Sequence, residues 1–259
     1  MNLEIAINIF GWLSAITIIS LSIPQLLKVL KDKKTGEINF ISFWIFHIGI
    51  LGWVFFAATS IQNLITVIVA DGAGLFINGV MTGLLYHYKK EFQFKKKLIA
   101  YVGILVTFIL GIIFIALFIK DYPIRAEIAT ATDAMVKDKL TNDLVFTFKP
   151  TITTVIGLIF PAFTTFAFLP QLITSFKLKD WRGVSIWMFV AFQVNNLIWI
   201  IWWVLLIVNI GSKAGLDVIA PFIVGLIWQI TNLVLYAIQI GFTLHNQHLV
   251  KTGQKTYAN

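Results

Sequence analysis

Long apolar runs separated by short polar stretches extend along almost the whole chain. A helix needs about 20 residues to cross the roughly 30 Å hydrocarbon core of a bilayer, and each run approaches or exceeds that length. The first run lacks the basic start and small-residue cleavage site of a secretory signal, so it counts as a helix. The pattern predicts seven membrane-spanning helices, over residues 3–27, 38–61, 64–86, 98–119, 151–176, 184–210 and 215–243.

Two blocks of the chain resemble each other. Residues 11–79 align with residues 157–225 without a gap, and 16 of the 69 aligned positions are identical. Apolar segments give chance matches of Leu, Ile and Phe, but aligned Pro, Gln, Trp, Asn and Asp are harder to obtain by chance. The alignment therefore predicts an internal repeat. Its identical pairs include Gly11/Gly157, Pro24/Pro170, Gln25/Gln171, Phe43/Phe189, Phe46/Phe192, Trp53/Trp199, Asp71/Asp217, Phe76/Phe222 and Gly79/Gly225.

Each repeat unit holds three helices, and an odd number would place the second unit upside down if the units were joined directly. The intervening helix restores the direction, which gives two parallel units in a 3+1+3 arrangement around a central cavity near the midplane. The predicted fold class is an all-α integral membrane protein of three parts. They are residues 1–90 for the first three-helix unit, 91–149 for the linker helix and outer polar loop, and 150–259 for the second unit and tail.

Composition and charge support the same class. The chain is 58% hydrophobic and 12% charged, with too few polar residues to cover a soluble globule. Of its 20 Lys and Arg residues, 14 fall in three loops and the tail on one side. The positive-inside rule places the N-terminus outside and the C-terminus in the cytoplasm, and a bacterial cell membrane is the expected location. The net charge of +8 is therefore a topology signal, and nucleic-acid binding is not expected.

Polar residues inside the spans are candidates for function. Proline in a helix interior costs about 3 kcal/mol, so a Pro-Gln pair repeated at the same place predicts a hinge, with a static kink as the alternative. His47 and its repeat partner Gln193 lie within apolar runs and could face a polar pathway, although a hydrogen-bonded packing histidine is at least as probable a reading. The sixth predicted span carries the densest polar cluster, formed by Gln193, Asn195, Asn196 and Trp199.

Carboxylates are expected away from the middle of the membrane. Asp71 and Asp217 are placed near the outer ends of their helices, which leaves His47 as the one candidate proton carrier at mid-span. The outer linker 120–149, with alternating charges, is expected to be a solvated loop with a short amphipathic helix around residues 124–140.

These motifs together resemble the PQ-loop repeat. They are the Pro-Gln pair in the first helix of a three-helix unit, a basic turn after it, Gly183-Val184-Ser185, and Asn196-Leu197-Ile198-Trp199. The family includes SWEET and SemiSWEET sugar carriers, lysosomal cystine and cationic amino acid exporters and, more distantly, nicotinamide riboside carriers. The resemblance implies alternating access, with Pro24, Gln25, Pro170 and Gln171 as hinge or gate residues and with Trp53 and Trp199 flanking a central pocket.

The resemblance leaves the solute open. Phe76 and Phe222 occupy positions at which the sugar carriers have paired asparagines, so a sugar, an amino acid and a vitamin all remain possible. The residues expected to bind the solute are Trp53, Phe76, Asn78, Gln193, Asn195, Asn196, Trp199, Phe222, Asn232 and His47.

No pattern of catalytic or metal-ligating residues stands out, so an enzyme, a metal and a cofactor are not expected. The absence of cysteine excludes disulfides. The expected function is a facilitative carrier of a small neutral or zwitterionic solute, with the lipid bilayer as its surroundings and homo-oligomerisation left open. The alternative is a membrane receptor or sorting protein of the same architecture that does not transport.

Overall fold

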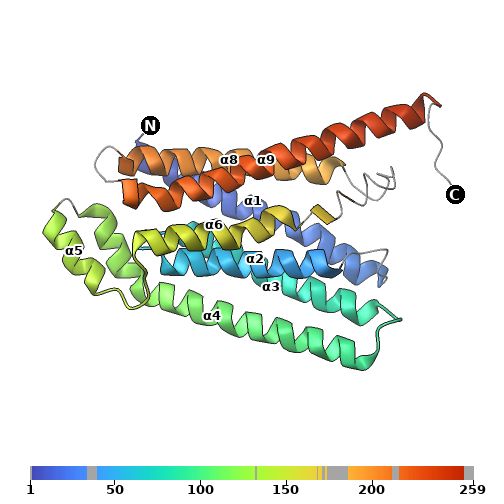
Figure 1. Ribbon diagram of the computed structural model, residues 1–259, viewed down its shortest axis with the longest axis horizontal. Coiled ribbons are helices and arrows are strands. Elements are labelled where there is room, and N and C mark those ends of the chain that lie inside the picture. The colour runs from blue at the N-terminus through green and yellow to red at the C-terminus, as the bar shows by residue number, and fades with distance from the viewer. Residues whose placement is uncertain are drawn as a thin grey trace.

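The protein is a bundle of helices (Figure 1). The structure, a computed structural model, describes residues 2–33, 40–131, 133–167, 169–170, 173, 186–211 and 216–253. Within these residues there is no strand, and six helices are long and apolar enough to cross a membrane. The helices are α1 (Leu3–Asp32), α2 (Phe40–Thr59), α3 (Ile65–Tyr88), α4 (Phe94–Thr130), α5 (Ala134–Asn142), α6 (Pro150–Phe166), α8 (Ile186–Gly211) and α9 (Leu216–Lys251).

The fifth predicted span differs from the prediction. A helix was expected over residues 151–176, but α6 has 17 residues and ends at Phe166. A proline ring crowds the carbonyl four residues before it and offers no N–H to that carbonyl. Pro170 stands four residues after Phe166 and cannot donate to its carbonyl, and the described residues 169–170 and 173 are again helical. The structure therefore shows six long apolar helices and one shorter one among the described residues, and most of residues 167–176 lie outside that part.

The helices lie roughly along one direction, so the bundle has two ends (Figure 1). We call the end with α5 and the N-terminus the linker end, and the opposite end, where α3 passes into α4 through the lysine-rich residues 89–97, the basic end. Helices α1, α3, α6 and α9 run from the linker end to the basic end, and α2 and α8 run back. Corresponding helices of the two repeats therefore point the same way.

Helix contacts arrange the two repeats in a ring. In order, α1 packs on α3, α3 on α2, α2 on α6, α6 on α9, α9 on α8, and α8 on α1. The two repeats meet at two places, α1 with α8 and α2 with α6, which we call the two seams. Because α1 corresponds to α6 and α2 to α8, the seams are equivalent under the repeat. Helix α4 lies outside the ring against α2 and α3.

Glycines allow close approach at both seams. A Cβ atom at Gly11 would lie 2.6 Å from Nε1 of Trp202, and one at Gly157 would lie 2.8 Å from Cε2 of Phe56. These contacts are equivalent, because residues 11 and 157 correspond in the repeat, as do residues 56 and 202. Small residues let helices in a membrane approach closely, where packing contacts drive association. Equivalent positions of the two repeats therefore make equivalent close contacts at the two seams.

A buried aromatic core fills the linker half of the ring. Trp53, Trp199, Trp202 and Trp203 are each at most 6% exposed and contact one another or share neighbours. The core continues through Phe56, Leu64 and Val67.

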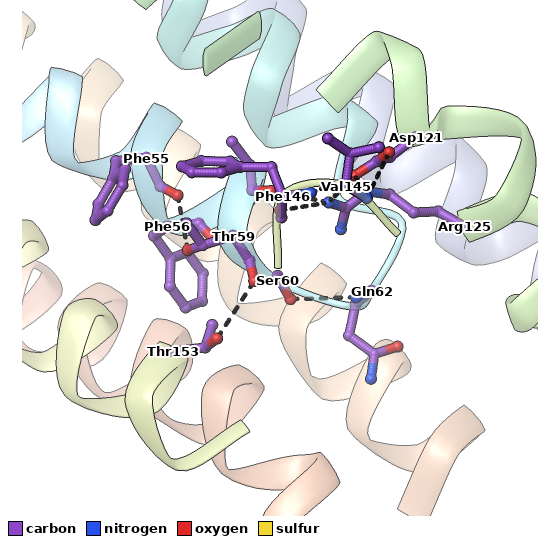
Figure 2. Close-up of polar contacts among 11 residues, drawn as sticks. Phe55, Phe56, Thr59, Ser60, Gln62, Asp121, Arg125, Val145, Phe146 and Thr153 are labelled. Atoms are coloured by element: carbon purple, nitrogen blue, oxygen red, sulfur yellow. Dashed lines mark hydrogen bonds and ion pairs between the residues drawn. The ribbon is translucent and has the colours of Figure 1, made fainter. Parts of the chain in front are cut away.

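The outer linker is more ordered than the sequence indicated. Residues 120–149 were expected to form a solvated loop with a short helix around residues 124–140. Instead α4 continues to Thr130, and the chain returns by α5, a separate short helix that overlaps the expected one. Asp121 and Arg125, one helical turn apart on α4, are fully buried in contact with the returning segment, labelled at Val145 and Phe146 in Figure 2. Two of the charges, Asp121 and Arg125, thus attach the linker to the bundle, whereas the other charged residues of 120–149 are exposed, as expected.

Hydrogen bonds fix that returning segment. The Asp121 carboxylate accepts from the backbone N–H groups of Val145 and Phe146 at 3.1 and 3.0 Å. Arg125 Nη2 donates to the carbonyl of Ala58 at 2.8 Å and to that of Phe146 at 3.3 Å, and it lies 3.7 Å from Asp121. The segment then bonds to α2, because Phe148 N–H donates to the Thr59 carbonyl at 3.0 Å. The linker is thereby attached to the linker end of α2.

Candidate solute-binding site

A cavity of about 210 Å³ lies between the two repeats and is lined by residues of all six ring helices. It is smaller than the roughly 300–1,000 Å³ of pockets for drug-sized ligands, so it suits a small solute. Its polar lining comes from Ser42, Asp71, Asn78, Thr164, Asn195, Asn196, Gln229 and Asn232. Its aromatic lining comes from Phe43, Phe46, Trp53, Phe192, Trp199, Trp203 and Tyr236.

The cavity lies along the inner side of the ring, from the level of Val67 and Trp53 toward the basic end. Ser42 is the third residue of α2 and Trp53 the fourteenth, so the lining follows that helix for about 16 Å. Trp53, Trp199 and Trp203 also belong to the buried aromatic core, which fills the space beyond them. The tryptophans therefore close the cavity toward the linker end.

Side-chain hydrogen bonds cross both seams beside the cavity. Thr17 Oγ1 of α1 donates to Asn195 Oδ1 of α8 at 2.7 Å. Trp53 Nε1 of α2 donates to Thr164 Oγ1 of α6 at 3.2 Å. A side-chain hydrogen bond can be exchanged for another when helices shift, so these two contacts join the repeats without fixing their relative position.

Two amide side chains of the lining have unused hydrogen-bonding groups. Asn196 is 4% exposed, and its Nδ2 has no hydrogen-bond partner among the described residues. Asn232 Oδ1, across the ring on α9, likewise has none within the described part of the chain. A buried polar group without a partner costs free energy, so such groups next to a cavity mark positions where a polar solute would be stabilised.

Asp71 lies inside the bundle, where the sequence analysis did not expect a carboxylate. Helix α3 begins at Ile65, so Asp71 is its seventh residue and stands about 9 Å along the helix. It is half-buried and lines the cavity. The sequence analysis placed Asp71 near the outer end of its helix, whereas the structure places it about two turns into α3 with its side chain at the cavity.

Six of the residues predicted to bind the solute line the cavity: Trp53, Asn78, Asn195, Asn196, Trp199 and Asn232. Besides Asp71, the prediction missed Phe46, Phe192 and Tyr236. The repeat alignment held a signal for two of these, since Phe46 and Phe192 are an identical pair.

The other four predicted residues lie outside the cavity lining. Gln193 Nε2 donates to the Leu233 carbonyl of α9 at 2.8 Å. Phe76 packs against Phe108 of α4 with ring centroids 4.7 Å apart, and Phe222, which is 1% exposed, packs against Trp203.

His47 is buried between helices rather than facing the cavity. Its Nδ1 lies 3.1 Å from Asn78 Oδ1, and its Nε2 lies 2.7 Å from Thr107 Oγ1 of α4. Both ring nitrogens therefore have protein partners, and the side chain has no exposed surface. This geometry matches the packing histidine that the sequence left open as an alternative.

The four predicted hinge residues fall mostly outside what the structure describes. Pro24 and Gln25 belong to α1, but their side chains are outside the described part, and Gln171 is outside it entirely. Pro170 lies in a helical turn beyond the end of α6 and is partly buried. Their role as hinges stays a prediction.

The position of His47 gives a testable expectation. His47→Ala should lower the free energy of unfolding by about 1–3 kcal/mol, because it leaves the buried Asn78 Oδ1 without its partner and removes one of the two hydrogen bonds of Thr107 Oγ1, which keeps its bond to the Ile104 carbonyl. The folded variant should keep the solute selectivity of the wild type. Thermal unfolding in detergent and binding of a solute panel would measure the two effects, with Thr107→Val as a matched change on the α4 side. A folded His47→Ala protein that binds no solute would contradict this placement.

Comparison with known proteins identifies the repeated segments. The family model described as "PQ loop repeat" matches the chain twice, at residues 6–66 and 152–211. Each match covers the first two helices of one repeat. A search of curated proteins finds no significant match. The sequence, the six apolar helices and the two matches agree, and the chain is a multi-pass membrane protein that carries two PQ-loop repeats.

Proposed function

We propose that this protein is a membrane carrier that moves a small neutral or zwitterionic solute through the central cavity by alternating access. In this proposal α6 and the residues after it complete a seventh span, and α4 joins two parallel three-helix units in a 3+1+3 arrangement. The N-terminus lies outside and the C-terminus lies in the cytoplasm, as the charge distribution predicts.

The observation that carries the proposal is a cavity shared by both repeats. Toward the linker end, side chains alone close it. Both repeats line it, and the tryptophans close it toward the linker end. A substrate site at the interface of two repeats, with access from one side at a time, is the arrangement that alternating access needs. Glycine contacts and a small number of side-chain hydrogen bonds at the seams are compatible with one repeat rocking against the other.

The coupling mechanism is a separate part of the proposal. Facilitative transport was expected because no carboxylate was placed within a span, and Asp71 in the cavity removes that reason. We keep facilitative transport as the simpler mechanism, and an imposed pH gradient in the flux assay tests it.

Filling the cavity should stop transport without unfolding the protein. Gly74 lines the cavity, and a Cβ atom there would meet only Ile50 Cγ2, at 3.8 Å. We expect Gly74→Leu to abolish exchange of labelled solute across sealed proteoliposomes, because its side chain occupies the solute volume. Gly241→Leu on α9 is the matched control, since a Cβ there meets nothing within 4 Å.

The outcomes separate the candidate functions. Exchange by wild type and Gly241→Leu but not by folded Gly74→Leu supports a carrier that uses this cavity. Equal exchange by Gly74→Leu would place the pathway elsewhere. Binding of a solute by the wild type without any exchange would show a receptor instead.

A further inference from the structure

Asp71 is the only Asp or Glu among the described residues that line the cavity, and no Lys, Arg or His of the described chain lines it. We propose that the cavity binds its solute through a positively charged amino group, with Asp71 as the anchor. The inference rests on the cavity being the solute site, and it narrows the solute to small molecules that carry an ammonium group.

The Asp71 carboxylate has no counter-charge or hydrogen-bond donor in the described part of the chain. The two ion pairs found there, Lys89 with Glu91 and Arg125 with Asp121, both lie elsewhere. No hydrogen bond to Asp71 occurs in the described chain, in contrast to Asp121, which accepts two backbone N–H groups. A carboxylate inside a membrane protein is costly unless it is paired, so an unpaired one at a cavity indicates a ligand that supplies the positive charge.

The walls of the cavity favour an organic ammonium group over a metal ion. A hard metal ion needs six or more oxygen ligands, whereas the described residues hold no group of three or more His, Cys, Asp or Glu that could bind a metal. The cavity instead presents the rings of Phe46, Trp53, Phe192, Trp199 and Tyr236. The faces of aromatic rings attract ammonium groups, and their apolar surface accommodates a hydrocarbon skeleton.

The unused amide groups complement this anchor. Asn196 Nδ2 is a hydrogen-bond donor without a partner among the described residues. It suits an oxygen of the solute, such as that of a carboxylate or carbonyl, while the amino group binds Asp71. A zwitterion can use both groups, so the proposal falls within the solute class of the proposed function.

The test compares three probes with one carbon skeleton: phenethylamine, 2-phenylethanol and phenylacetate. Binding to the purified full chain in detergent is measured by calorimetry for the wild type, Asp71→Asn and Asp138→Asn. The last variant makes the same carboxylate-to-amide change on exposed α5. We expect the wild type and Asp138→Asn to bind the amine about 10- to 100-fold more tightly than the alcohol, as a charge-assisted hydrogen bond contributes, and Asp71→Asn to bind the two equally.

The proposal is overturned if the wild type binds the alcohol or the phenylacetate as tightly as the amine, a result that does not depend on the folding of any variant. It is also overturned if monodisperse Asp71→Asn keeps the preference for the amine. Exchange in proteoliposomes separates this inference from the proposed function. Amine-selective binding without exchange would overturn the proposed carrier function and support Asp71 as the anchor. Exchange of uncharged solutes at equal rates in wild type and Asp71→Asn would support the carrier function and overturn the role of Asp71.

Discussion

Arg125→Met should lower the free energy of unfolding by about 3–5 kcal/mol, since it leaves the Asp121 charge buried without its partner. Both side chains are fully buried, and Arg125 also donates to the carbonyls of Ala58 and Phe146. The loss would appear as a large fall in the thermal unfolding temperature in detergent. Lys137→Met on exposed α5 is the matched control and should change it little.

A double variant tests the physical reason. Asp121→Asn combined with Arg125→Met should recover much of the loss, because removing both charges removes the uncompensated one. Arg125 Nε and Nη1 have no hydrogen-bond partner among the described residues, which already weakens the native pair. The opposite outcome is additivity, in which Asp121→Asn lowers stability by the same amount in the Arg125→Met protein as in the wild type. The two residues would then act independently, and the explanation would fail.

Gly49→Val should separate the α2–α6 seam. A Cβ atom at Gly49 would lie 2.5 Å from the backbone nitrogen of Thr164 and 3.1 Å from the backbone carbon of Phe163. Backbone atoms cannot move aside as a flexible side chain can, so we expect a loss of about 3 kcal/mol, the upper end of overpacking effects. Thermal unfolding and size-exclusion chromatography in detergent would detect it.

The control for this change lies on α9. Gly241→Val introduces the same side chain where no atom lies within 4 Å of a Cβ, so its unfolding temperature should match that of the wild type. A Gly49→Val protein as stable as Gly241→Val would mean that the helices do not approach so closely at this seam.

The sequence predicted the parts of the fold that depend on hydrophobic length and repetition. Apolar runs locate most of the helices, and the repeat places Trp53 with Trp199 and Phe46 with Phe192 around one cavity. These features follow from local pattern alone, because a run of about 20 apolar residues has few alternatives to a membrane helix.

The sequence could not show which polar groups face the cavity. His47 and Asp71 both lie in the first repeat, but the first is enclosed by Asn78 and Thr107 while the second lines the cavity. That difference depends on how each helix is rotated about its axis, which packing decides. The prediction for the linker failed at Asp121 and Arg125 for a similar reason. The sequence indicated that both charges are solvated, but the returning segment covers them in the folded protein.

The linker makes the two seams mechanically unequal. At the linker end, Thr59 of α2 accepts from Phe148 N–H and, at 3.4 Å, from Thr153 Oγ1 of α6, so a strap crosses the α2–α6 seam. No segment of the described chain braces the α1–α8 seam in the same way. If the molecule opens toward the linker end, we expect α1 and α8 to separate first, with the α2–α6 seam acting as the hinge. Two repeats of similar sequence would then contribute unequally to the motion, because the linker braces only one of the two seams between them.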